Sequence, residues 1–104
     1  MNDRLLDSGL LYSDGDPVVI RVRFHGRHYR LDDNGAAVAK ARAAGTTDRW
    51  LEIAERVAAE NALDVNRRGV VFTSGIREAQ IEAVAARVAR SSRAVESELL
   101  AVEA

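Results

Sequence analysis

The stretch PVVIRVRFHGRHYRLDDNG, from Pro17 to Gly35, has the most regular pattern in the chain. Apolar side chains occupy alternate positions from Val18 to Phe24, which is the period of a strand with one buried face. His25-Gly26 follows, and glycine readily takes the positive φ angle that a two-residue hairpin turn requires. The stretch therefore predicts a β-hairpin that ends in an acidic turn.

A turn at His25-Gly26 would place Arg21 opposite Arg30 and Arg23 opposite His28, with the apolar pairs on the other face. Because like charges directly opposite one another destabilise a sheet, we expect an anionic group over this face. That group is a partner protein, nucleic acid or carboxylates of the same chain. The alternative is a solvated strand face whose arginine stems cover apolar surface. The candidate binding residues are Arg21, Arg23, Arg27, His28 and Arg30.

The composition limits the classes of protein. A chain of 104 residues, 47% hydrophobic and 30% charged, is long enough for one domain (residues 1–104) and too short for two. The net charge of −1 argues against a nucleic-acid binder that relies on overall charge. The chain contains no cysteine, which excludes disulfides, thiolate catalysis and cysteine-ligated zinc. No cofactor is predicted.

The first residues lack a basic region followed by an apolar run, so no signal peptide is expected. No apolar run approaches the roughly 20 residues that span a bilayer. The sequence therefore predicts a cytoplasmic protein without a membrane partner.

The remaining pattern predicts an α+β fold, in which helices cover one face of a small antiparallel sheet made of a three-strand meander and one later strand. Residues 1–7 are expected to be frayed or a short turn. The other predicted elements are a strand at Gly9–Tyr12, helices at Gly35–Ala44 and Asp48–Leu63, a buried strand at Gly69–Thr73, and a long helix from Gly75 almost to the C-terminus.

The last helix poses a problem of length. About 28 residues would measure about 42 Å, whereas a domain of this size is only about 30–35 Å across. The helix must therefore break near Ser91-Ser92 or project from the domain. A projecting end would expose an apolar stripe and predicts a homodimer or a partner helix. The alternative is ordinary packing on the sheet. The predicted interface residues are Val88, Val95, Leu99 and Val102.

Four aspartates flank the predicted hairpin. Antiparallel pairing would bring both acidic turns to one end of the sheet, where several carboxylates could bind Mg²⁺ or Ca²⁺. The alternative is that aspartate simply suits turns and helix N-caps. The candidate metal ligands are Asp14, Asp16, Asp32 and Asp33. The two histidines, His25 and His28, are expected to point to different faces and to form no catalytic pair.

The acidic turns and the strand between them resemble a family of small bacterial proteins, the domain of unknown function numbered 1828. The resemblance rests on Tyr12–Pro17, Tyr29–Leu31, Asp32–Gly35 and a later strand like Gly69–Phe72. It would cover nearly the whole chain. It implies a shared fold, but no activity and no catalytic residues.

No motif in the sequence specifies a reaction. We therefore predict a small bacterial interaction or regulatory protein, a homodimer or complex subunit, whose arginine-lined hairpin is the docking face. One alternative is a nucleic-acid-binding module that uses the same hairpin. The other is a metal-dependent phosphodiesterase or nuclease built on the aspartates.

Overall fold

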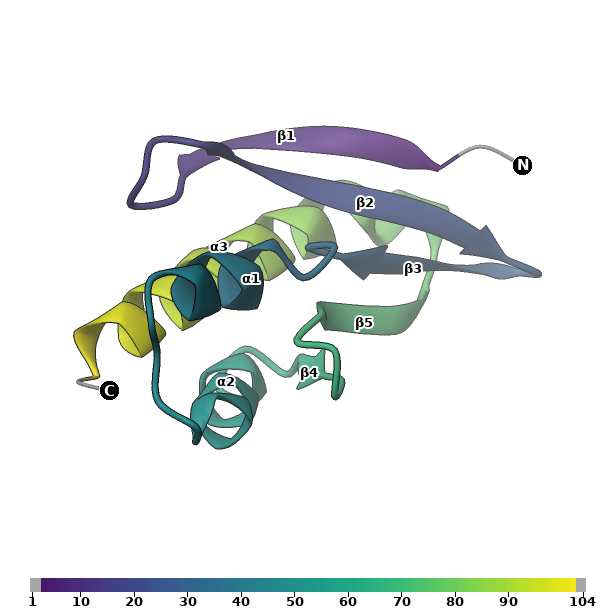
Figure 1. Cartoon of the computed structure of the whole chain (residues 1–104). Helices are drawn as coiled ribbons and strands as arrows, with labels where there is room; N and C mark the ends of the chain where they lie inside the picture. Colours follow the sequence, from purple (N-terminus) through teal and green to yellow (C-terminus); the bar gives the residue numbers. More distant parts are fainter. Residues whose placement is uncertain (1–2, 103–104) are drawn as a thin grey trace.

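A computed structural model describes residues 3–102, and it confirms the α+β fold. Five antiparallel strands form one sheet in the order β1-β2-β3-β5-β4, and the helix α3 packs along it (Figure 1). The helices α1 and α2 pack against α3. The strands are β1 (Arg4–Leu11), β2 (Pro17–His25), β3 (His28–Asp32), β4 (Asp64–Val65) and β5 (Val71–Ile76); the helices are α1 (Ala36–Ala43), α2 (Trp50–Ala59) and α3 (Ile81–Ala101), with a 3₁₀ turn at Glu78–Gln80.

The alternating pattern of β2 buries one face, as predicted. Val18 and Ile20 are fully buried and Val22 is 2% exposed, and the fully buried Leu31 of β3 joins them in the core. The side chains that alternate with them point away from α3. The two faces of the hairpin were therefore assigned correctly from the sequence.

The register of the hairpin differs from the prediction. His25 pairs with His28, so the turn residues are Gly26 and Arg27, and every pair shifts by two positions along β3. A shift of two keeps each side chain on its face, because the side-chain period of a strand is two. It changes the partners, however: Arg21 lies opposite Asp32 instead of Arg30.

The first strand begins earlier than predicted, at Arg4, so residues 4–7 are neither frayed nor a turn. Its pairing with β2 shifts register between Asp7 and Leu11, where Gly9 has a φ angle of +80°. The Ser8 hydroxyl donates to the Val18 carbonyl at 2.6 Å within this irregular stretch. The half-buried side chains still alternate at Leu6, Ser8 and Leu10. The first half of the strand was missed because the polar Ser8 occupies one of these inward positions and the apolar Leu5 is exposed.

The later strand pair also differs from the prediction. The two-residue strand β4 lies between the helix predicted to end at Leu63 and the strand predicted to begin at Gly69. It was not predicted, because two residues are too few to show a period. The strand β5 starts at Val71, because Gly69 lies in a turn in which the Asn66 Oδ1 accepts from the Arg68 and Val70 amides. It runs on past its predicted end at Thr73 through Ser74 and Gly75, although Gly75 was predicted to begin the last helix.

The helix α3 neither breaks nor projects. Its 21 residues correspond to about 32 Å at 1.5 Å per residue. The radius of gyration, 13.1 Å, is that of a compact domain, but the longest dimension is 41 Å, so the fold is elongated enough to hold the helix. No helix within residues 3–102 is long and apolar enough to cross a bilayer.

Polar partners keep α3 continuous at the predicted break. Ser91 and Ser92 are fully buried, and Glu96 is 1% exposed. The Ser92 hydroxyl bonds to Tyr12 and Asp33, and the Glu96 carboxylate accepts from the Ser13 amide at 3.0 Å and the Ser13 hydroxyl at 2.8 Å. Ser92 and Glu96 thus attach the helix to the β1–β2 turn, whereas the Ser91 hydroxyl has no hydrogen-bond partner among the described residues.

Gly69 is required where the β4–β5 turn meets α1. Its φ angle is +80°, and an added Cβ would lie 2.7 Å from Cγ1 of the buried Val38. We expect Gly69→Ala to lower the free energy of unfolding by about 2–4 kcal/mol, since strain of the left-handed backbone adds to overpacking. Denaturation in urea measures the change.

Gly15→Ala is the matched control. Gly15 has a φ angle of +89°, but nothing lies within 4 Å of an added Cβ. Only the backbone cost of about 1–2 kcal/mol is expected there. Equal losses in the two variants would show that the contact with Val38 contributes nothing.

Candidate functional site

The arginine-lined hairpin face is partly neutralised by the chain itself. Asp32 is fully buried, and its carboxylate accepts hydrogen bonds from the Arg21 Nε and Nη2 atoms, both at 3.1 Å. The Arg30 Nε atom lies 3.6 Å from Oδ2 of the same carboxylate. One carboxylate therefore serves two guanidinium groups, and one positive charge remains uncompensated within this group of three.

Arg30 is held in place by its surroundings. Its guanidinium carbon lies 4.3 Å from the centre of the Phe72 ring, a cation–π contact with the neighbouring strand β5. The Nε atom is buried and has no hydrogen-bond partner among residues 3–102. The Arg30 guanidinium is thus held in position although its Nε atom makes no hydrogen bond.

The other predicted cations lie towards the hairpin tip. The Arg23 Nε atom lies 3.5 Å from Asp3, and both side chains are about half exposed. Arg27 is a turn residue and is exposed, as is His28. The hairpin therefore brings all five predicted residues onto one element, but Arg21 and Arg23 already have acidic partners.

The tip projects beyond the body of the protein (Figure 1). Phe24 is 40% exposed, and its ring lies 5.1 Å from that of its register partner Tyr29, tilted by 59°. His25 and His28 are also register partners, so they share a face, and the prediction that they point to different faces is wrong. The predicted turn was one residue early, which reversed their relation.

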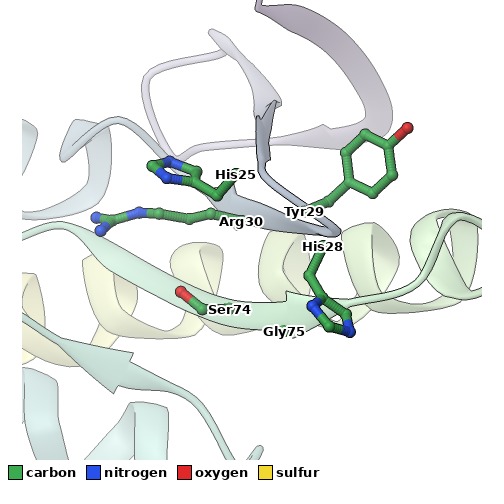
Figure 2. Close-up of a pocket in the computed structure, with 6 residues that line it drawn as sticks. All are labelled: His25, His28, Tyr29, Arg30, Ser74 and Gly75. Carbon is green, nitrogen blue, oxygen red and sulfur yellow. The ribbon is translucent and has the colours of Figure 1, made fainter.

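A pocket of about 360 Å³ lies beside this tip, between the hairpin and β5 (Figure 2). Sequence reasoning missed four of its residues, because β5 was predicted to end at Thr73, His25 was assigned to the turn, and Tyr29 was assigned to the apolar face. Only the pairing of β3 with β5 could have revealed the neighbourhood. The lining residues are His25, His28, Tyr29, Arg30, Ser74 and Gly75.

The four aspartates do not form a metal site. Asp14 and Asp16 each accept a hydrogen bond from the Lys40 Nζ atom at 2.6 Å, whereas Asp32 faces the arginines. The strand β3 is shorter than β2, so Asp32 pairs with Arg21, about 13 Å along β2 from Pro17. Within residues 3–102 no group of three or more metal-ligating side chains comes together.

Asp33 belongs to a buried network instead. Its Oδ1 atom accepts from the amides of Gly35 at 2.9 Å and Val71 at 3.0 Å, and Oδ2 accepts from the Ser92 hydroxyl at 2.6 Å. Since the Ser92 proton goes to Asp33, the Tyr12 hydroxyl donates to Ser92 at 2.7 Å. Burial raises the pKa of Asp33 above 3.8 despite these donors, and burial likewise raises the pKa of Tyr12 to about 12.

The predicted interface on the last helix is wrong for three of its four residues. Val88, Val95 and Leu99 are fully buried against the chain's own sheet and helices. Val102, just past the end of α3, is 37% exposed. Because the chain's own sheet and helices cover Val88, Val95 and Leu99, these three side chains are not available to a partner.

Comparison of the chain with family models, curated proteins and solved structures finds no match.

Asp32 is expected to stabilise the fold as well as organise the arginine face. Asp32→Asn removes the charge that faces Arg21 and Arg30, and should lower the free energy of unfolding by about 2–4 kcal/mol. Asp3→Asn removes only an exposed partner of Arg23 and should cost about 0.5 kcal/mol or less. Urea denaturation of both variants measures the contrast, and a loss at Asp32 as small as at Asp3 would contradict it.

Asp33 should make stability depend on pH in an unusual direction. Because its pKa is raised in the folded state, its contribution to stability is fully present below about 3.8 and is lost as the pH rises through the raised value. The difference in unfolding free energy between the native chain and Asp33→Asn should therefore shrink as the pH increases from 4. Denaturation at a series of pH values measures it.

Asp14→Asn provides a control of opposite sign. The hydrogen bond from Lys40 lowers the pKa of Asp14, so its contribution is present above about 3.8 and is lost as the pH falls. For Asp33, the contrary result would be a difference in unfolding free energy, native chain minus Asp33→Asn, that grows as the pH rises. It would mean that the hydrogen bonds to Asp33 lower its pKa by more than burial raises it.

Proposed function

We propose that the chain is a protein-binding module that docks an acidic partner surface on the projecting end of its β2–β3 hairpin. The supporting observation is the combination found there: the aromatic pair Phe24 and Tyr29, partly exposed, on one face, and the exposed pair His25 and His28 on the other, with the exposed Arg27 in the turn between the strands. Aromatic and arginine side chains are enriched at protein interfaces and often dominate their binding energy.

The arrangement of charge supports a compact docking surface over an extended one. Arg21 and Arg30 share Asp32, and Arg23 faces Asp3, so the remaining positive charge is concentrated near the tip. A nucleic-acid strand would need a run of phosphate contacts along the hairpin, and bases would need open aromatic faces. Phe24 and Tyr29 instead pack against each other. These features favour a protein partner over nucleic acid.

The proposal keeps the predicted role of a complex subunit and the hairpin as docking face, and narrows that face to the projecting end of the hairpin. Self-association through the last helix is not part of it, because Val88, Val95 and Leu99 are buried. The metal-dependent nuclease is not proposed either, because its four aspartates lie in separate interactions. Membership of the small bacterial family that the sequence resembles stays a prediction.

Site-specific photo-cross-linking in cells of the source organism tests the docking surface. A photoreactive phenylalanine analogue at Phe24 should give a protein adduct, and the same analogue at the exposed Glu55 of α2 should give at least about tenfold less. Arg27→Ala should reduce the adduct at Phe24, since it removes a charge from the tip. The mass of the adduct tells a foreign protein from a second copy.

Three results would contradict the proposal. They are an adduct that nuclease degrades, adducts of equal yield at both positions, and no adduct at Phe24.

A further inference from the structure

The pocket beside the hairpin tip gathers hydrogen-bond donors from three strands, β2, β3 and β5. His25 and His28 are register partners, and Arg30 follows on the same face of β3. Figure 2 shows the Arg30 and His25 side chains extending to the same side, with Ser74 below them on β5. None of the six lining residues is acidic. The pocket is therefore suited to an anion.

An irregularity in β5 builds the lower wall. Leu31 pairs with Thr73 and Tyr29 with Ile76, so Ser74 and Gly75 lie together opposite the single residue Arg30. This is a β-bulge, in which the extra residue leaves the hydrogen-bonded ladder. Gly75 has a φ angle of +73°, which glycine adopts without strain. The bulge places Ser74, with its hydroxyl, and Gly75 in the wall of the pocket.

Arg30 supplies the fixed charge. Its guanidinium is held between Asp32 and the Phe72 ring, and Asp32 is engaged more closely by Arg21. A cation that is fixed and only half neutralised binds an anion without having to be ordered first. The pocket is open to a ligand from solvent, because three of its lining residues, His25, His28 and Ser74, are exposed.

We propose that this pocket binds the phosphate group of a phosphorylated side chain on the partner protein. The inference rests on the proposed function and deepens it. A phosphate monoester offers three acceptor oxygens and up to two negative charges, which match an arginine, a hydroxyl and two imidazoles better than a carboxylate does. The pocket holds one such group, and the neighbouring Arg21 and Arg23 are occupied by aspartates, so an isolated phosphate fits better than a polynucleotide.

The test is an NMR titration of the full ¹⁵N-labelled chain with a blocked tripeptide, Ala-phosphoserine-Ala, up to about 10 mM. We expect the Ser74 and Gly75 amide signals to shift and saturate, and the same tripeptide with plain serine to cause no shift. Ser74→Ala and His28→Ala should each weaken binding about fivefold or more. Ser97→Ala removes a hydroxyl from an exposed position of α3 and should leave binding unchanged.

Several results would overturn the proposal. They are an absence of saturable shifts, equal binding of the two tripeptides, tighter binding of inorganic phosphate than of the phosphopeptide, and equal effects of Ser74→Ala and Ser97→Ala. A short single-stranded DNA that displaces the peptide and shifts signals along all of β2 would overturn it in favour of nucleic acid. If cross-linking at Phe24 succeeds while the titration fails, only the phosphate site falls and the docking surface stands.

Discussion

The buried carboxylate of Asp33 joins more parts of this fold than any other polar group within residues 3–102. It binds the amides of Gly35 before α1 and of Val71 on β5, and through Ser92 it reaches α3 and Tyr12. A buried carboxylate without such partners would strongly destabilise the protein. The sheet, two helices and the β1–β2 turn must therefore come together in one arrangement that satisfies it.

Asp32, the preceding residue, organises the opposite face. Neighbouring residues at the end of a strand point to opposite sides of the sheet. The Asp32 carboxylate therefore faces the arginines, and the Asp33 carboxylate faces α3. Asp32 holds Arg21 directly and Arg30 at a longer distance, which fixes the hairpin face without neutralising it completely. Two adjacent aspartates at the end of β3 thus stabilise the buried core on one side of the sheet and the arginine face on the other.

The local pattern predicted the buried face of the hairpin but not which residues lie opposite one another across its two strands. The alternation of Val18, Ile20 and Val22 gave the buried face correctly, because burial on a strand follows a period of two. The pairing was wrong by two positions, since glycine fits either of the two central turn positions. That small difference gave Arg21 an ion pair with Asp32 in place of the predicted repulsion from Arg30. It placed Arg23 opposite Arg30 instead, so one like-charge pair remains on this face.

The sequence by itself determined the α+β class, the buried face of β2 and the cationic character of the hairpin, because these depend on the order and chemistry of nearby residues. Tertiary structure decided what each charged or polar side chain does. Ser92 is 59 positions from Asp33 and 80 positions from Tyr12 in the chain, yet its hydroxyl bonds to both side chains. The pocket at Ser74 likewise exists only because β5 pairs with β3 through a bulge. Contacts between distant segments depend on strand register and helix placement, which no local pattern specifies.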